Sequence, residues 1–372
     1  MKVLIVTGIW PPDVGGPASH APEFAGWLRS RGIAAEVVTT ADAAPAKQPY
    51  KVHWVARSLP PGVRHAQVLR VVAREARTAD VVYEISMLGR STLGATLART
   101  PFVAKLPSDP AYERARRRGL FGGDMDAFQQ ERGGLGIRAL RLARDLELRR
   151  AAHVVCPSAY LRELAIGWGV APGRVTVVPN PAPPIPADMA SREELRASLG
   201  FDGPTLVFAG RLTRQKTLEV AFAAVERNPG VHLLVVGDGP ERAQLEARAG
   251  EQVRFLGAQP RERVLELFRA ADASLLSSAW ENFPHGVVES LAVGTPVISS
   301  AIGGVAEVVR DGENGLLVPA GDVDALAGAI GRYLGDEALQ ERLRAAAPQS
   351  LGAFAADQVY GKLEAILRGA MR

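Results

Sequence analysis

Two glutamates, Glu281 and Glu289, stand eight residues apart around a strand-to-helix turn. An apolar run ends near Ser277, Pro284 marks a loop, and a segment with helical spacing of apolar residues continues to Gly294. The start of a helix has unpaired backbone N–H groups and a positive dipole end, so it suits an anion such as phosphate. Carboxylates only accept hydrogen bonds, which suits sugar hydroxyls. On spacing alone, two ordinary exposed charges remain the alternative.

Two cations follow an earlier strand end, where a diphosphate would need them. The run 204–209 is apolar and is followed by Gly210, and Arg211 and Lys216 lie in the turn after it. Arginine forks onto phosphate oxygens, and lysine adds a point charge. Lysine is scarce in this chain, so Lys216 in this turn is more than compositional background. A solvated charge pair is the alternative.

Glycine turns occur at two further strand ends. The turn Val236-Gly237-Asp238-Gly239 lacks the third glycine of a dinucleotide fingerprint, which disfavours a nicotinamide-dependent oxidoreductase. Near the N-terminus, Gly15 and Gly16 precede a predicted helix, so the backbone there can approach a ligand closely. A plain structural turn is the alternative.

A polar group follows the predicted strand 101–105. Lys105 ends this strand, Asp109 stands in the next loop, and Arg114 and Arg117 belong to a basic run. Asp109 is placed to face a ligand at the strand ends, and the arginines suit an anionic acceptor. An Asx turn or helix N-cap explains Asp109 as well, and a solvated helix face explains the arginines.

The stretch 277–296, followed by Gly303-Gly304 and Glu307, resembles the E-x7-E signature of retaining glycosyltransferase family four, which has the GT-B fold. The resemblance implies that Glu289 binds the ribose hydroxyls of a nucleotide and that Glu281 lies by the hydroxyls of the donor sugar. It also implies donor contacts by the residues between them, with the role of the histidine open: Asn282, Phe283, His285, Gly286 and Val287.

The turn 210–217 resembles the family's G-R-L-x-x-x-K-G phrase, whose arginine and lysine hold the donor diphosphate. Thr217 stands where glycine is common, which should alter the loop backbone slightly without removing the charges. The resemblance implies that Gly210 and Gly237 lie beside the nucleotide and that the base packs near Leu256. Because two cations are present, we expect neither a metal nor another cofactor.

The first loop, with its prolines and glycines, resembles the family's P-P-x-x-G-G loop, so Gly15 and Gly16 are candidates for contact with the donor phosphate. In the same half, Lys105, Arg114 and Arg117 are acceptor-binding candidates. Asp109 is both an acceptor-binding and a catalytic candidate. The other catalytic candidates are in the second half: Arg211, Lys216 and Glu281.

Short apolar runs alternate with amphipathic segments along the whole chain, which predicts βαβ units and parallel sheets. The proline-rich stretch 178–186 is the best linker candidate. We therefore predict an α/β protein of GT-B type, with two doubly wound, Rossmann-like domains facing across a cleft. The N-terminal acceptor-binding domain would span 1–182 and be joined by a terminal helix at 353–372, and the nucleotide-sugar domain would span 183–352.

The charge is unevenly distributed. Residues 1–180 contain 25 Lys and Arg against 15 Asp and Glu, whereas the rest of the chain is net acidic. The basic half could bind an anionic membrane surface, or it could be an ordinary solvated surface. Cys156 is the only cysteine, so no intramolecular disulfide can form. We expect a cytoplasmic protein, with peripheral binding to the inner membrane face as an option, and no nucleic-acid partner.

The family resemblance implies a retaining hexosyltransferase. It would move a sugar from a UDP- or GDP-sugar to a hydroxyl acceptor in glycan, glycolipid or small-glycoside synthesis. The family resemblance implies a front-face displacement in which the leaving phosphate helps to deprotonate the acceptor. The alternatives are a nucleotide-sugar epimerase of the same fold and a non-catalytic nucleotide-sugar-binding protein.

Overall fold

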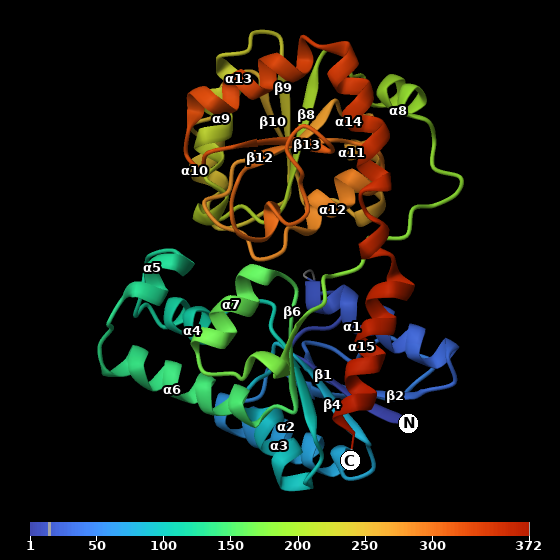
Figure 1. Cartoon of the computed structure of the whole chain (residues 1–372), viewed down its shortest axis with the longest axis vertical. Coiled ribbons are helices and arrows are strands. Elements are labelled where there is room, and N and C mark those ends of the chain that lie inside the picture. Colours follow the sequence, from blue (N-terminus) through green and yellow to red (C-terminus); the bar gives the residue numbers. More distant parts are fainter. Residues whose placement is uncertain (14–15, 372) are drawn as a thin grey trace. The chain divides into compact units, whose positions relative to one another are not determined.

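The computed structural model describes residues 1–13 and 16–371, which form two units, each built on its own parallel sheet (Figure 1). Unit 1 contains Met1–Asn180 and Asp357–Arg372, and unit 2 contains Pro181–Ala356. Parallel strands alternate with helices in both units, so the predicted doubly wound α/β class is confirmed.

In its described residues, unit 1 has a seven-stranded sheet of order β3-β2-β1-β4-β5-β6-β7. The strands are β1 (Lys2–Thr7), β2 (Ala34–Ala41), β3 (Val52–Ala56), β4 (Val81–Ile85), β5 (Phe102–Lys105), β6 (His153–Cys156) and β7 (Val175–Val177). The helices are α1 (Gly16–Ser30), α2 (Pro61–Ala76), α3 (Arg90–Ala98), α4 (Pro110–Arg117), α5 (Met125–Gln130), α6 (Leu135–Arg150), α7 (Ala159–Gly167) and α15 (Ala356–Ala370).

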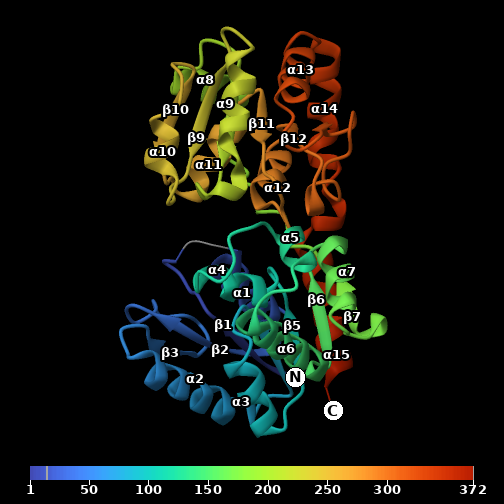
Figure 2. The ribbon, with the colours of Figure 1, turned by 90° about the vertical axis from the view of Figure 1, so that its left-hand side faces the viewer.

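Helices cover both faces of the unit 1 sheet. Side chains alternate across a strand, so Leu4 and Val6 of β1 pack on the face of α2, α3 and α7, whereas Val3 and Ile5 pack on the face of α1 and α15. Figure 2 shows α2 and α3 side by side below their face of the sheet. Although α15 ends the chain, its Leu363 is buried in this first unit.

The described part of unit 2 has a six-stranded sheet of order β10-β9-β8-β11-β12-β13. The strands are β8 (Thr205–Ala209), β9 (His232–Val236), β10 (Val253–Gly257), β11 (Ala273–Leu276), β12 (Val297–Ser300) and β13 (Gly315–Val318). The helices are α8 (Arg192–Leu199), α9 (Leu218–Glu226), α10 (Arg242–Glu246), α11 (Arg261–Ala270), α12 (His285–Ala292), α13 (Val323–Leu334) and α14 (Glu337–Gln349).

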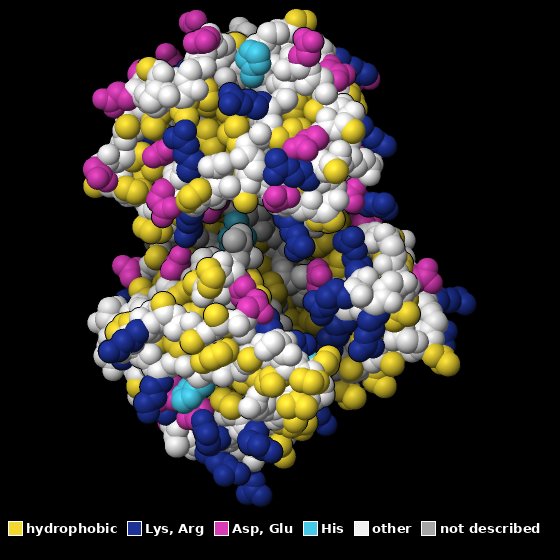
Figure 3. Space-filling view, turned by 180° about the vertical axis from the view of Figure 1, so that it is seen from behind, with side chains coloured by type: hydrophobic (Ala, Val, Ile, Leu, Met, Phe, Trp, Pro, Cys, Tyr) yellow, Lys and Arg dark blue, Asp and Glu magenta, His cyan; other side chains and the backbone are white. Residues whose placement is uncertain are grey.

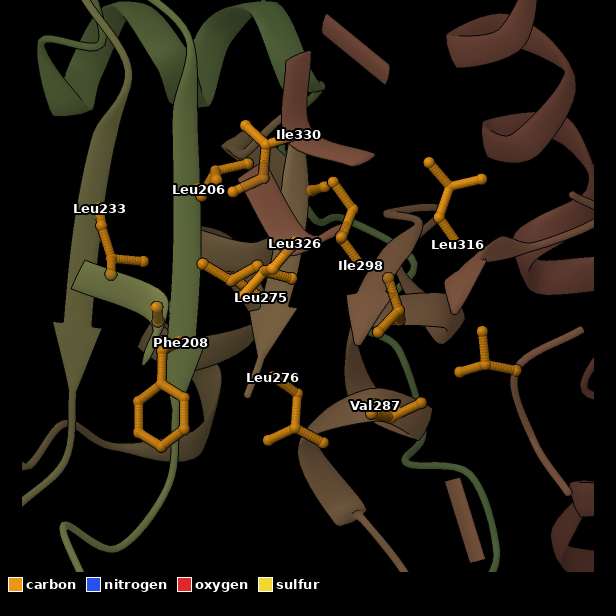
Figure 4. Close-up of a cluster of buried hydrophobic side chains, with 14 of the residues drawn as sticks. Leu206, Phe208, Leu233, Leu275, Leu276, Val287, Ile298, Leu316, Leu326 and Ile330 are labelled. Atoms are coloured by element: carbon orange, nitrogen blue, oxygen red, sulfur yellow. The ribbon is translucent and has the colours of Figure 1, made fainter. Parts of the chain in front are cut away.

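The larger apolar core of unit 2, drawn in part in Figure 4, includes the consecutive residues Val297 and Ile298 of β12, so it extends to both faces of the sheet. Leu206 and Phe208 of β8 point into it, and Leu326 and Ile330 of α13 meet them from the helix layer. On the opposite face, Val207 packs with α11. Strands covered on both faces read as continuous apolar runs, as β8 and β9 do, so these strands could be recognised in the sequence.

Three helices of unit 1 leave no clear periodic signal in the sequence. Helix α3 consists mostly of small residues, and α4 is mostly charged, so neither shows a clear apolar stripe. Helix α5 has only six residues, which is too short for a periodic signal. None of the described helices is both long enough and apolar enough to cross a membrane.

One buried carboxyl in the unit 1 sheet has consequences for stability. Glu84 of β4 is 1% exposed, and its Oε2 accepts a hydrogen bond of 3.2 Å from the Thr92 hydroxyl. Its Oε1 has no hydrogen-bond partner among the described residues. Burial raises the pKa of Glu84 from 4.5 to about 7, because the charged form loses its hydration.

We expect Glu84→Gln to stabilise the protein above pH 7 and to have little effect near pH 4.5. The unfolded chain releases this proton near its ordinary pKa, whereas the folded chain keeps it to about pH 7. Wild-type stability therefore falls between these values, by about 3 kcal/mol, and glutamine avoids this loss. Chemical unfolding at pH 5 and pH 8 measures the difference, with the exposed Glu131→Gln as control. An equal effect of Glu84→Gln at both pH values would contradict the expectation.

Candidate functional site

The turns after β8 and β9 pack directly on each other at the carboxyl edge of the unit 2 sheet. The Gly210 N–H donates to Val236 O at 2.9 Å, and the Leu212 N–H donates to Asp238 O at 2.9 Å. A Cβ on Gly237 would lie 1.9 Å from Gly210 O, and the φ of Gly237 is +130°. Glycine is therefore required there because two backbones meet, whatever ligand lies nearby.

The two candidate cations differ in their surroundings. Arg211 is exposed, and among the described residues its guanidinium has no hydrogen bond or ion pair. Lys216 ends the 3₁₀ turn Arg214–Lys216, and its side chain is 16% exposed. Its Nζ is ion-paired with Glu281 Oε1. The structure thus brings the predicted phosphate-binding lysine and the predicted sugar-binding glutamate into contact.

Several hydrogen bonds join the lysine loop to the loop that carries Glu281. The Ser277 hydroxyl donates to Lys216 O at 2.9 Å, and the Thr217 hydroxyl donates to Ser277 O. The Gln215 side-chain amide donates to Trp280 O at 2.8 Å. The two loops, far apart in the sequence, therefore form one connected structure.

Thr217 adopts a backbone conformation that glycine favours. Its φ is +40°, in the left-handed region, which is costly for a β-branched residue. The hydrogen bond from its hydroxyl to Ser277 O holds it in place. The departure from glycine noted in the sequence thus leaves the left-handed backbone and the nearby Lys216 in place.

Glu281 is held at both its side chain and its backbone. The side chain is 7% exposed, and Oε1 accepts a hydrogen bond of 2.8 Å from the Ser278 hydroxyl besides the ion pair with Lys216. The Glu281 carbonyl accepts from the Gly304 N–H at 3.0 Å. A Cβ on Gly303 would lie 2.2 Å from that carbonyl, so this glycine permits the close approach.

Helix α12 begins beside the end of β8. A Cβ on Gly286 would lie 3.1 Å from Ala209 O, which places the first turn of the helix against that strand. The N-cap residue, Pro284, makes no side-chain capping bond. The start of this eight-residue helix, with its positive dipole end, therefore lies close to the turn that carries Arg211, and the Val287 N–H donates to Pro284 O at 3.1 Å.

The remaining donor candidates have distinct surroundings. The Phe283 and His285 rings make an edge contact with centroids 5.6 Å apart, and Asn282 is buried. Val287 points into the apolar core, so only its backbone can serve a ligand (Figure 4). Glu289 lies one helical turn after His285, and its Oε1 is 3.3 Å from the Arg261 Nε of α11.

Leu256 is next to Gly257, whose carbonyl accepts from the Gly237 N–H at 2.8 Å. It lines a cavity of about 370 Å³ beside the unit 2 sheet, together with apolar residues of other elements: Leu199, Phe201, Leu234 and Leu267. Neither the 210–217 turn nor the 277–289 segment contributes to this cavity. The contact between Leu256 and a nucleotide base stays a prediction.

In unit 1, the described part of the first loop is anchored by Asp13. Its carboxylate accepts from the Trp10 N–H at 3.0 Å and is ion-paired with Arg57. The hydrogen bond from Arg57 lowers the pKa of Asp13, against the effect of burial. Gly16 is the first residue of α1, and the candidate Gly15 lies outside the described residues.

Lys105 is buried at the end of β5. Its Nζ donates to Asn180 Oδ1 at 2.6 Å and lies 3.5 Å from His20 Nε2. Burial lowers the pKa of Lys105 from 10.5 to about 7, because the charged form is poorly solvated. A lysine so enclosed is bound to its own unit rather than presented at the surface.

Asp109 has the surroundings of a structural carboxylate. It is fully buried and caps α4, accepting from the Ala111 N–H at 2.8 Å through Oδ1. Its Oδ2 accepts from Arg144 at 2.7 Å and from the Gln129 side chain at 3.1 Å. These contacts favour the N-cap interpretation over a catalytic one.

The four acceptor candidates do not form one cluster. Lys105 is bonded to Asn180 and Asp109 to Arg144, whereas Arg114 donates to Leu88 O at 2.8 Å. Arg117 is exposed. Gln215 and Ser278, which organise the Glu281 loop, could not be predicted from the sequence, because contacts between distant loops leave no periodic signal.

One group of potential metal ligands occurs among the described residues, in unit 1: Glu36, His53 and Glu75. Neighbouring cations already pair with its carboxylates. Lys2 Nζ lies 3.1 Å from Glu36 Oε1, and Arg74 Nε lies 2.6 Å from Glu75 Oε1. This group therefore needs no metal for charge balance.

Comparison with protein families gives two matches that together cover most of the chain. A model described as glycosyl transferases group 1 matches residues 191–350, and a glycosyl transferase 4-like domain matches residues 15–181. A D-inositol 3-phosphate glycosyltransferase of Xylanimonas cellulosilytica is 38% identical over 195 residues, which are 49% of this chain and 45% of that protein.

A lipopolysaccharide core biosynthesis glycosyltransferase, LpsE of Rhizobium meliloti, is 38% identical over 147 residues, which are 38% of this chain and 43% of that protein. The chain thus spans about half or less of the length of these two relatives. Among solved structures, Anabaena HepE in complex with UDP and glucose has a TM-score of 0.80 at 22% identity, covering 99% of this chain and 100% of that one. Sucrose-phosphate synthase of Thermosynechococcus elongatus has a TM-score of 0.79 at 19% identity, covering 99% and 98%. These likenesses show a shared fold.

Proposed function

The chain belongs to the group 1, family-four-like glycosyltransferases, and we propose that it transfers a hexose from a nucleoside-diphosphate sugar to a hydroxyl acceptor with retention of configuration. The observation that carries the proposal is the joined pair of loops in unit 2. They place Lys216 against Glu281, close to the uncapped start of α12 and the exposed Arg211.

The proposed donor roles follow from the charges of these groups. Arg211, Lys216 and the first N–H groups of α12 would bind the diphosphate, whose negative charge grows as the sugar leaves. Glu281 would accept hydrogen bonds from sugar hydroxyls, and Glu289 from the ribose. Since these residues can balance the charge of the leaving group, we propose that no metal is required.

The proposed chemistry needs no protein nucleophile. The bond between the anomeric carbon and the diphosphate oxygen breaks while the acceptor oxygen bonds to the same face of that carbon. The acceptor proton passes to the departing phosphate oxygen. The protein would contribute positioning and charge stabilisation, which we assign to the unit 2 loops.

A uridine nucleotide is the first donor to test, because the structurally similar HepE has been solved with UDP and with UDP-glucose. A GDP-sugar is the second. The basic character of residues 1–180 supports an anionic acceptor or membrane surface. Figure 3 shows many Lys and Arg side chains on one face of unit 1.

Helix α6 adds to the support for a membrane surface. Its outward side carries three exposed leucines, Leu135, Leu142 and Leu146, interspersed with the exposed Arg138 and Arg149. Apolar and cationic side chains mixed on one helix face suit anionic headgroups above acyl chains. We therefore propose a protein located in the cytoplasm that binds the inner membrane face peripherally.

A donor panel tests the proposed activity. The protein is incubated with UDP-glucose, UDP-galactose, UDP-N-acetylglucosamine or GDP-mannose in the presence of EDTA, with glycan and lipid acceptors. We expect release of the nucleoside diphosphate from one donor, and proton NMR should show a product with the donor's anomeric configuration. An epimerised donor without transfer would point to the isomerase, and binding without turnover to a non-catalytic protein.

A further inference from the structure

The carboxylate of Glu281 is held in place through one of its two oxygens. Oε1 receives both the Ser278 hydroxyl, at 2.8 Å, and the Lys216 ammonium. Among residues 1–13 and 16–371, no hydrogen bond or ion pair is found for Oε2. Glu281 and Ser278 are both buried, at 6% and 0% exposed. Solvent therefore does little to orient this carboxylate.

Under the proposed function, Lys216 has two possible anionic partners. In the unliganded protein it pairs with Glu281, whereas a bound diphosphate offers it two further negative charges. Drawing the ammonium toward the phosphate weakens its bond to Oε1. If Lys216 alone oriented the carboxylate, Glu281 would lose its orientation when the donor sugar arrives.

Ser278 can supply what Lys216 gives up. It lies three residues before Glu281 in the same loop, and its hydroxyl reaches Oε1 without depending on the ligand. A charge-assisted O–H···O⁻ bond to a buried carboxylate is among the stronger hydrogen bonds in proteins. The Gly304 N–H fixes the Glu281 backbone at the same time, at 3.0 Å from its carbonyl oxygen.

We propose that Ser278 is a positioning residue for donor-sugar recognition: it holds Glu281 through Oε1, so that Oε2 stays available to a sugar hydroxyl when Lys216 turns to the diphosphate. This inference rests on the proposed function and adds a residue to the same site. It predicts that the Ser278 hydroxyl contributes to the affinity for a nucleotide sugar and not to the affinity for a nucleoside diphosphate that carries no sugar.

The neighbouring Ser277 provides a matched control. It has the same side chain and the same complete burial, but its hydroxyl binds Lys216 O and Thr217 O rather than Glu281. Loss of that hydroxyl loosens the lysine loop, which should weaken diphosphate and nucleotide-sugar binding alike. Loss of the Ser278 hydroxyl should affect only the ligand that carries a sugar.

Calorimetry with UDP and UDP-glucose, or with the donor that the panel selects, tests this difference. For Ser278→Ala we expect UDP affinity within twofold of wild type, UDP-glucose affinity at least fivefold weaker, and kcat lowered about tenfold. Ser278→Thr, which keeps a hydroxyl at this position, should retain most of the wild-type kcat. Ser277→Ala should lower the affinities for UDP and for UDP-glucose by similar factors.

The outcomes separate this inference from the proposed function. Suppose that the wild-type protein binds and turns over a donor. If Ser278→Ala then behaves like wild type, or if its affinities for UDP and UDP-glucose fall by equal factors, the positioning role is wrong and the proposed function stands. If the wild-type protein turns over no nucleotide sugar, the proposed function itself fails. Thermal unfolding of each variant shows whether the fold is retained, and Ser278→Cys replaces any variant that does not fold.

Discussion

Lys216→Met should lower kcat by about 100- to 1,000-fold while the protein stays folded. Removing one fixed charge from the position where a leaving group becomes negative typically has an effect of this size. Nucleoside diphosphate binding should weaken about 10- to 100-fold, since a hydrogen bond to a charged group contributes about 1.5–3 kcal/mol. Methionine keeps the length of the side chain, so the change isolates the charge. Steady-state nucleotide release and calorimetry measure the two effects.

Arg214, two residues before Lys216, offers a control for it. It lies in the same 3₁₀ turn, but its side chain is 82% exposed and its nearest acidic partner is Glu241, at 3.6 Å. Arg214→Met removes the same formal charge two residues away, and we expect less than a threefold change in kcat. Equal losses in both variants would show that Lys216 acts through the general charge of the turn, and unchanged activity in Lys216→Met would reject its assignment.

Local patterns in the sequence were sufficient to predict the architecture of unit 2 and the proximity of its key residues. Strands buried on both faces gave apolar runs, and the turns that follow them carried Arg211, Lys216 and Glu281. These residues come from two loops more than 60 positions apart, yet parallel strands bring their carboxyl ends to one edge. The contact between Lys216 and Glu281 follows from that topology.

The fine structure of the same site could not be predicted from spacing. Ser278 is one of several serines in a polar loop, and only the folded backbone shows that its hydroxyl reaches Glu281. The role of Gly237 was also hidden, because the constraint on it is the carbonyl of Gly210, which lies in the turn after another strand, β8. Contacts between loops depend on how neighbouring strands align, and a one-dimensional pattern does not contain that information.

The acceptor candidates illustrate a different difficulty. Asp109, at the end of a strand, has the position of a catalytic group, and no local feature of the sequence distinguishes it from one. Its partner Arg144 lies 35 residues later, on α6. Arg144 is itself 3% exposed and lies against the Trp168 ring, at 3.9 Å from the ring centroid. Only this packing shows that the carboxylate serves the fold.

Asp109→Ala should destabilise the protein by about 3 kcal/mol, because it breaks the buried pair with Arg144 and leaves this arginine with the less buried Asp145 as its acidic partner. Asp109→Asn keeps an oxygen that accepts from the Ala111 N–H, so it should lose less stability than Asp109→Ala. At low temperature, where both variants remain folded, we expect kcat within about threefold of wild type. Full stability combined with lost turnover in Asp109→Asn would instead establish a catalytic role.

A second change in the same pair separates the two roles further. Asp109→Ala combined with Arg144→Met removes both buried charges, and methionine fills part of the space beside Trp168. Because replacing a buried ion pair costs far less than breaking it, the double variant should be more stable than Asp109→Ala alone by at least 1 kcal/mol. If Asp109 were catalytic, kcat would stay low in the double variant even where stability recovers, since removing the arginine cannot restore a missing acid. Chemical unfolding of the two single variants and the double variant, together with kcat for each, therefore distinguishes a structural aspartate from a catalytic one.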